Sequence, residues 1–168
     1  FAEKNNTAVV LATTGLNEEQ IKSVENVSKK APVFFSYNMS IGVSLLCEIS
    51  KTVAKVLGNG FDIEIIEAHH NKKIDAPSGT AIMLGNAVKE ELPDHYFEYD
   101  RFSKRQKRES NEIGIHSVRG GTIVGEHQVI FAGNDEILTL SHSARSRAIF
   151  ATGAVNAAVF ISEKENGM

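Results

Sequence analysis

The chain contains 168 residues, of which 42% are hydrophobic and 23% are charged, and these values are typical of a globular protein with one core and a little more. Its formal net charge of −3 argues against a generally basic surface that binds nucleic acid. No apolar run reaches the ~18 residues that a membrane-spanning helix needs. We therefore predict neither a nucleic-acid partner nor a membrane partner.

The single cysteine, Cys47, lies among the apolar positions of a predicted helix. Because its neighbours are apolar, we expect a buried thiol. A single cysteine cannot form an internal disulfide, so we also expect a cytoplasmic location. The chain begins at Phe1 without a methionine, and residues 1–4 resemble the end of an element. We therefore expect a fragment of a longer protein.

Residues 7–13 form a short, continuous apolar run, which is typical of a strand buried on both faces of a parallel sheet. Asn17, with Gln20 three positions later, predicts a capping box and a helix over residues 18–30. Residues 33–35 then predict a second buried strand. Together these elements form a βαβ pattern.

In such a pattern the loops that follow the strands, residues 12–15 and 36–39, lie at the edge where α/β sheets bind ligands. No Gly-x-Gly-x-x-Gly sequence follows a strand anywhere in the chain. We therefore interpret the pattern as a remnant of a Rossmann domain rather than as a whole one.

Ser40 predicts the start of a helix over residues 41–57, whose apolar positions follow a helical stripe. Residues 61–69 alternate in part between apolar and polar side chains, which predicts a strand. Ser78 is the expected N-cap of a further helix over residues 80–92.

Residues 94–112 have a low apolar content and include the basic run of residues 101–108. We interpret this segment as a mobile, solvated loop. A contact with an acidic ligand or a partner is the less favoured alternative.

Three strands with clear turns between them follow, over residues 113–118, 122–132 and 136–142, and residues 146–162 predict a final helix rich in small residues. With the strand at 61–69, they predict a mostly antiparallel sheet of four strands with helices on one face. The predicted fold class is therefore α/β, a βαβ remnant followed by an α+β domain.

The densest group of titratable side chains lies in residues 64–81, where His69 and His70 are adjacent at a strand end. Neighbouring strand residues point to opposite faces, and joint metal binding would need a helical spacing or a third ligand, so we expect no metal site. The imidazole groups suit proton transfer and anion binding. A structural role at the strand end is the alternative.

Lys73 lies in the loop that leads to Ser78, Gly79 and Thr80 at the start of the predicted helix. Backbone N–H groups and the positive end of the helix dipole form an anion site there, and Gly79 allows a ligand to approach the main chain. The residues alone therefore predict a site for a small anionic molecule.

Several motifs resemble those of the 4-hydroxy-tetrahydrodipicolinate reductases, also called dihydrodipicolinate reductases. The most specific is the stretch 64–81, Glu-Ile-x-Glu-x-His-x-x-x-Lys-x-Asp-x-Pro-Ser-Gly-Thr-Ala. The others are Ala12-Thr13-Thr14-Gly15, Ser36-Tyr37-Asn38-Met39-Ser40-Ile41-Gly42-Val43, the segment 118–127 and Ser143-Ala144-Arg145-Ser146-Arg147. Ala12 and Met39 stand where this family usually has Gly and Phe.

The resemblance implies an enzyme that reduces a dipicolinate precursor of lysine and diaminopimelate with NADPH or NADH. It implies that His69 donates or accepts a proton, that Lys73 is the second proton donor, and that a small dicarboxylate is the substrate. The implied substrate-binding residues are His70, Ser78, Gly79, Thr80 and Arg147. The implied cofactor-binding residues are Ala12, Thr13, Thr14, Ser36, Tyr37, Asn38 and Met39.

The resemblance also implies a dinucleotide-binding remnant over residues 1–39, a substrate-binding and oligomerisation domain over 40–146, and a helix over 147–168 that returns to the first domain. It implies a homotetramer that associates through the sheet of the substrate domain. We expect the chain to have little or no activity alone. The alternative is a non-catalytic oligomerisation or dicarboxylate-binding module with the same fold.

Overall fold

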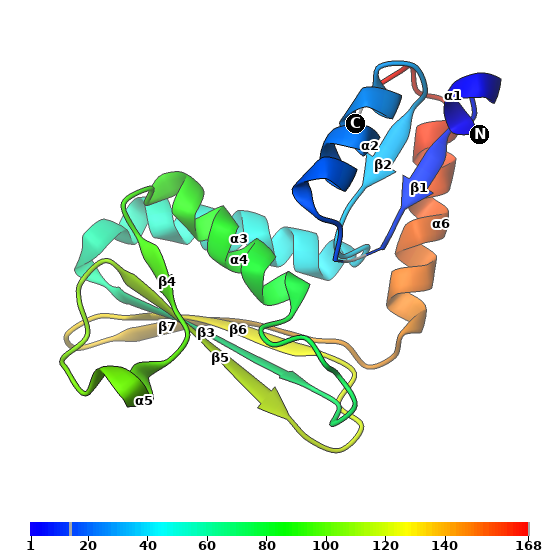
Figure 1. The fold of residues 1–168 in the computed structure, drawn as a ribbon. Helices are drawn as coiled ribbons and strands as arrows, with labels where there is room; N and C mark the ends of the chain where they lie inside the picture. Colours follow the sequence, from blue (N-terminus) through cyan, green and yellow to red (C-terminus); the bar gives the residue numbers. More distant parts are fainter. Residues whose placement is uncertain (14, 168) are drawn as a thin grey trace. The chain divides into compact units, whose positions relative to one another are not determined.

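A computed structural model of the protein describes residues 1–13 and 15–167 (Figure 1). The chain divides into two compact units. The first contains residues 1–41 and 147–168, and the second contains residues 42–146.

The first unit contains the predicted βαβ pattern. Its elements in chain order are α1 (Ala2–Asn5), β1 (Val9–Leu11), α2 (Glu18–Ser28), β2 (Val33–Phe35) and, from the end of the chain, α6 (Ala148–Ser162). β1 and β2 pair in parallel, and Figure 1 shows them between α2 and α6. The capping box of Asn17 and Gln20 is formed, so this prediction is confirmed.

β1 is shorter than predicted, β2 has its predicted bounds, and both strands are less buried than predicted. β1 covers three residues rather than the whole of 7–13, and its side chains are half-buried, as are Phe34 and Phe35. The described part of this sheet has two strands, so neither strand has a neighbour on both sides. The prediction that both strands are fully buried is therefore wrong for these residues.

Helix α6 approaches another part of the first unit closely at Gly153. A Cβ atom built on Gly153 would lie 1.8 Å from the carbonyl oxygen of Met39, so the helix backbone packs directly against the chain after β2. A glycine is needed at this position because any side chain would collide with that carbonyl.

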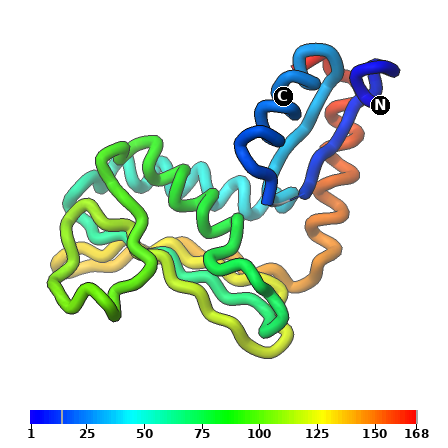
Figure 2. Tube along the Cα trace, in the orientation of Figure 1, coloured from blue at the N-terminus to red at the C-terminus, as the bar shows by residue number. Residues whose placement is uncertain are grey.

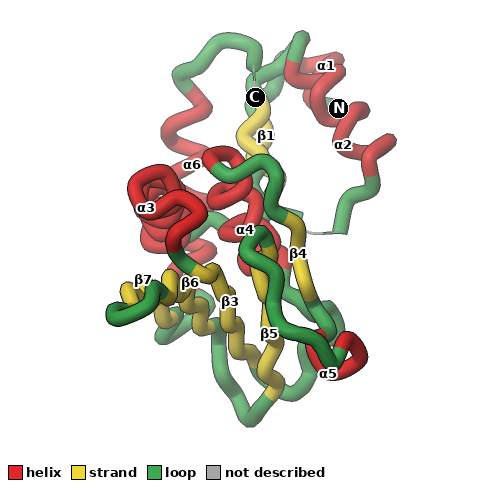
Figure 3. Tube along the Cα trace, turned by 90° about the vertical axis from the view of Figure 1, so that its left-hand side faces the viewer, coloured by secondary structure: helices red, strands yellow, loops and turns green. Residues whose placement is uncertain are grey.

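The second unit is a sheet covered by helices. Its elements are α3 (Ile41–Leu57, beginning in the first unit), the 3-10 turn η1 (Gly58–Gly60), β3 (Asp62–His69), α4 (Gly79–Glu91), β4 (Tyr96–Glu98), α5 (Arg101–Lys104), β5 (Glu112–Arg119), β6 (Glu126–Ala132) and β7 (Ile137–Ser143). Figure 3 shows α3 and α4 on one side of the strands. The fold class and the helices on one face are confirmed.

The sheet has one strand more than predicted and a different pairing. Its order is β4-β5-β3-β6-β7. β5 is parallel to both of its neighbours, β4 and β3, whereas β6 is antiparallel to both of its neighbours, β3 and β7. Figure 2 shows why: the chain leaves β3, runs through α4 and returns before it enters β5. A connection of that length permits parallel pairing, whereas the turns on either side of β6 do not.

Alternation along β3 divides the unit into two faces. Ile63 and Ile65 point toward the helices and are almost fully buried, together with Val129 and Phe131 of β6. Leu84 and Val88 of α4 complete the core, with Leu46 and Ala54 from α3. Cys47 is also buried, as predicted, and burial raises the pKa of its thiol to about 11.

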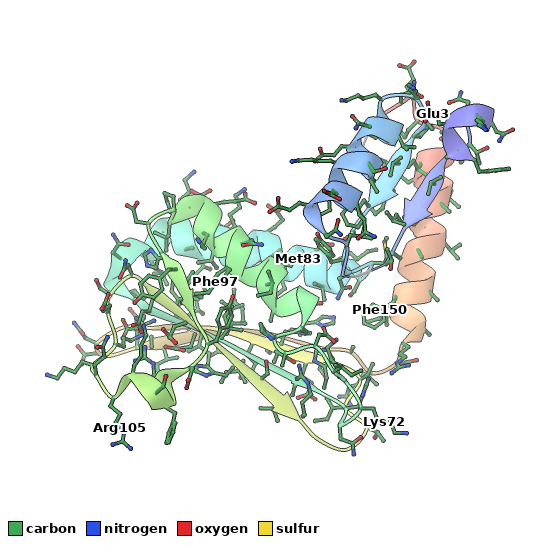
Figure 4. The ribbon with its side chains drawn as sticks, viewed as in Figure 1. Glu3, Lys72, Met83, Phe97, Arg105 and Phe150 are labelled. Atoms are coloured by element: carbon green, nitrogen blue, oxygen red, sulfur yellow. The ribbon has the colours of Figure 1, made fainter. Side chains whose placement is uncertain are left out.

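The basic segment is not simply a solvated loop. Arg108 donates to the side chain of Asp62 at 2.6 Å, to that of Glu64 at 3.2 Å and to the carbonyl of Glu112 at 2.6 Å. Arg101 and Lys104 also form ion pairs, with Glu112 and Glu98. The solvated interpretation is therefore wrong for these three residues, whereas Arg105 is exposed (Figure 4).

No helix among residues 1–13 and 15–167 is long and apolar enough to cross a membrane.

Candidate active site

The site forms where β3 ends, and its first element is the pair Glu67 and His69. These residues are two positions apart on one strand, so both side chains point to the same face. Glu67 Oε2 lies 2.5 Å from His69 Nδ1. The Glu67 side chain is fully buried, whereas that of His69 is 11% exposed, so the imidazole lies between the carboxylate and the surface.

Arg119 and the start of α4 complete the surroundings of Glu67. Arg119 is the register partner of His69 on β5, and its two terminal nitrogens donate to the two oxygens of Glu67 at 2.8 and 2.7 Å. The backbone N–H of Ser78 donates to Glu67 Oε1 at 3.1 Å. Burial alone would raise the pKa of Glu67, but the hydrogen bonds from His69, Arg119, Ser117 and Ser78 hold this pKa far below its usual range. Glu67 is therefore ionised.

Ser78 is the N-cap of α4, as predicted. Its Oγ accepts from the N–H of Ala81 at 3.2 Å and lies 3.1 Å from Nε2 of His127. Serine suits this place because its short side chain satisfies one of the first N–H groups of the helix. The same residue thus fixes the helix start to β3 through Glu67 and to β6 through His127.

His127 is the buried histidine of the site. Burial lowers its pKa to about 4, and the charges of His69 and Lys73 act in the same direction. The side chain is only 3% exposed, so a neutral imidazole lies beneath the surface residues. Because both His69 and Lys73 influence this pKa, the two proposed proton donors lie near the same buried ring.

Lys73 lies in the loop between β3 and α4. Its ammonium group lies 2.8 Å from the carboxylate of Asp75, and Arg119 donates to the backbone carbonyl of Asp75 at 2.6 Å. The loop is thus connected to β5 by the arginine that also binds Glu67.

Two glycines of the site differ in their surroundings. Nothing lies within 4 Å of the position that a Cβ atom of Gly79 would occupy. A Cβ atom on Gly125, by contrast, would lie 3.1 Å from Nε2 of His69, the ring nitrogen that does not contact Glu67. Residues 122–125, predicted as strand, form the turn before β6, and this turn carries Gly125 to His69.

The second unit brings together His69, Lys73, Ser78, Gly79 and Thr80 from the predicted site, with His70 following His69 at the strand end. Arg147 lies in the first unit, before α6, and its role stays a prediction. Ala12 and Thr13 follow β1, and Ser36, Tyr37 and Asn38 follow β2, so both loops lie at one edge of the parallel pair, with Met39 beyond. Thr14 lies outside the described residues.

Sequence reasoning missed the roles of Glu67, Arg119, His127 and Gly125. The spacing of Glu67 and His69 on a strand was an available signal. The contacts of Arg119 and His127 depend on strand register, which sequence patterns do not give. Among the described residues, no group of three or more His, Cys, Asp or Glu side chains has the geometry to hold a metal ion.

Comparisons with known proteins agree with this geometry. The family model described as dihydrodipicolinate reductase, N-terminus, matches residues 1–39, and the model described as dihydrodipicolinate reductase, C-terminus, matches residues 42–168. The chain belongs to the dihydrodipicolinate reductase family. The resemblance inferred from residues 64–81 is thereby confirmed.

The relatives in this family are longer than this chain. It is 54% identical over 168 residues to the 4-hydroxy-tetrahydrodipicolinate reductase of Caldanaerobacter subterraneus subsp. tengcongensis, covering 99% of this chain and 66% of the relative. It is 51% identical over 169 residues to that of Clostridium novyi, covering 100% of this chain and 67% of the relative. The chain thus spans about two thirds of the length of these relatives.

A solved structure of the family is also similar. The dipicolinate-bound dihydrodipicolinate reductase from Paenisporosarcina sp. TG-14 matches with a TM-score of 0.71 and 29% sequence identity, covering 98% of this chain and 63% of that one.

Proposed function

We propose that this chain provides the substrate site, and part of the cofactor site, of an NAD(P)H-dependent 4-hydroxy-tetrahydrodipicolinate reductase of lysine and diaminopimelate synthesis. The observation that carries the proposal is the placement of His69, held by Glu67, at the end of β3 beside the N-terminus of α4. Family membership supplies the reaction class, and the similarity to a dipicolinate-bound structure supports a dicarboxylate ligand.

The substrate would bind through its carboxylates. Ser78 uses its N–H on Glu67 and its Oγ on Ala81 and His127, so its role is to fix the helix start. We assign the carboxylate contact to the N–H groups of Gly79 and Thr80, where the dipole of a helix of 13 residues adds attraction. Lys73 supplies the positive charge nearby, and His70 contributes a further contact.

Reduction adds a hydride and a proton across a double bond of the ring. His69 would give the proton from Nε2, since Nδ1 is engaged with Glu67. One proton is needed for each hydride, and Lys73 is the second candidate for its source. The side chain of Lys73 is 21% exposed, so it can exchange protons with water between turnovers.

A nicotinamide cofactor fits the edge formed by β1 and β2. The loops that follow these parallel strands lie together there, joined by the hydrogen bond from Ser36 N to the carbonyl of Leu11 at 3.3 Å. Residues 12–14 and 36–39 would hold the cofactor, which supplies the hydride when bound. Their backbone groups permit contacts whatever the side chains of Ala12 and Met39 are.

The uncovered face of the sheet supports assembly into a homotetramer. β3, β5 and β6 direct Ile66, Val118 and Ile130 away from the helices, and Val118 is 48% exposed. Val118→Lys should convert the assembly to smaller species in sedimentation analysis; an unchanged mass would contradict association through this face.

The single, buried Cys47 agrees with a reducing, cytoplasmic location.

The test of the activity uses the complete reading frame that contains these 168 residues. Its product should reduce freshly generated dihydrodipicolinate with NADPH or NADH, and His69→Gln and Lys73→Ala should each lower kcat by about 100-fold or more. Lys72→Ala is the matched control, because Lys72 is the exposed neighbour of Lys73 (Figure 4). Unchanged rates in the two site variants, or equal losses in Lys72→Ala, would contradict the assignment. A non-catalytic module of the same fold would give no turnover at all.

A further inference from the structure

The buried carboxylate of Glu67 connects two parts of the site. Its Oε2 accepts from His69 and Arg119, and its Oε1 accepts from Arg119 and the N–H of Ser78. We propose that Glu67 is a positioning residue, which fixes both the protonated nitrogen of His69 and the start of α4, and that Arg119 holds its carboxylate in place. The effect of Glu67 on kcat rests on the proposed function, whereas its effect on the His69 tautomer and on the start of α4 does not.

The geometry assigns the tautomer of His69. Arg119 and the Ser78 amide are donors only, so the two oxygens of Glu67 act as acceptors and the carboxylate carries no proton. Nδ1 of His69, 2.5 Å from Oε2, must therefore donate a hydrogen. Nε2 is the nitrogen that gains or gives a proton, and it faces the space left by Gly125.

Only a carboxylate satisfies all these donors. In the wild-type chain each carboxylate oxygen of Glu67 accepts from two donors. A glutamine at position 67 has only one acceptor oxygen, and its NH2 group would replace the other oxygen and face two donors. With its NH2 group toward His69, it would force Nδ1 to accept and would move the ring proton to Nε2. With its NH2 group toward Ser78, it would break the anchor of α4. Either orientation damages one half of the site.

Arg119 makes the arrangement rigid. Its planar guanidinium binds both oxygens at once, and this fork prevents the carboxylate from rotating toward solvent. The same side chain binds the carbonyl of Asp75, so the loop that carries Lys73 is fixed to the same cluster. A single arginine on β5 thus links the supports of both proposed proton donors and of the carboxylate site.

Long-range 1H–15N NMR spectra of histidine test the proposal directly. We expect wild-type His69 at neutral pH to carry hydrogen on Nδ1, and Glu67→Gln to lose this fixed tautomer. In the complete reading frame, Glu67→Gln should lower kcat by about 100-fold, and Glu67→Asp should recover part of it because an acceptor pair is restored. Arg119→Lys should also lower kcat, because lysine keeps the charge and loses the fork.

Glu64→Gln is the matched control. Glu64 lies three positions earlier on the opposite face of β3, where its carboxylate binds His116 and Arg108. It should change stability without changing the His69 spectrum or kcat per folded molecule. If Glu67→Gln behaved like Glu64→Gln, Glu67 would be a structural ion-pair partner and the proposal would be overturned.

Two outcomes separate this inference from the proposed function. A wild-type spectrum with hydrogen on Nε2 and none on Nδ1 would overturn the inference even if every variant failed to fold. A fixed Nδ1–H tautomer that Glu67→Gln abolishes, in a protein whose complete reading frame reduces no dihydrodipicolinate, would support the positioning role and refute the function.

Discussion

The ring of His127 lies edge-on against that of His69, with the centroids 5.2 Å apart and an angle of 74° between the planes. His127 also contacts Ser78 at the start of α4, so one buried imidazole touches both the proposed proton donor and the helix that would hold the substrate. Because this imidazole is neutral, it adds no positive charge beside His69.

The stability of the chain should depend on pH through His127. Its pKa is about 4 in the folded chain, below the ordinary value of 6.5. Between these values the unfolded chain binds a proton that the folded chain does not, so stability is lost as pH falls from about 6.5 to 4, by up to about 3 kcal/mol. The chain has no tryptophan, so urea unfolding is followed by circular dichroism at pH 7.5, 6 and 5. His127→Gln should flatten this dependence, and parallel curves for the two proteins would contradict the assignment.

Gly125→Ala should damage the site more than the fold. The added methyl group would lie 3.1 Å from His69 Nε2 and would displace the ring by a few tenths of an ångström. We expect kcat in the complete reading frame to fall by about tenfold or more, with a change in unfolding free energy below about 1 kcal/mol. Gly120→Ala is the control, because nothing lies within 4 Å of its added Cβ. Equal activities of the two variants would show that Nε2 does not need this space.

Arg108 should be the most important residue of the basic segment for stability. Its side chain is 15% exposed and donates to two carboxylates and one carbonyl of β3 and to the carbonyls of Glu109 and Glu112. Arg108→Ala removes all of these hydrogen bonds and should cost about 2–4 kcal/mol. The exposed neighbour Lys107, changed to alanine, should cost less than about 0.5 kcal/mol. Equal small effects in urea unfolding would restore the interpretation of a solvated loop.

Local patterns in the sequence predict most of the helices, because caps and stripes are local. The capping box at Asn17 and the N-cap at Ser78 both form, and the helix predicted over residues 41–57 has these bounds. The parallel pairing of β5 with β3 was not predictable in this way. It depends on where the chain returns after α4, and turn residues carry no information about that path.

The site shows the same division. His69, Lys73 and the start of α4 are visible in one continuous stretch, residues 64–81. Glu67 belongs to this stretch, but its role depends on Arg119, 52 residues later. His127 and Gly125 reach the site only through the register of β6 and the turn before it. Long-range register thus decides which polar residues surround a motif.

The most direct test of the account is thermal unfolding of the 168-residue chain in the presence of pyridine-2,6-dicarboxylate. We expect the unfolding temperature to rise with ligand concentration, with about 2.7 kcal/mol of stabilisation at 100 times the Kd. Lys73→Ala should abolish most of the shift and Lys72→Ala should keep it, and pyridine-2-carboxylate should give a smaller one. A missing shift at millimolar ligand, or an equal shift in Lys73→Ala and wild type, would contradict a dicarboxylate site at the end of β3.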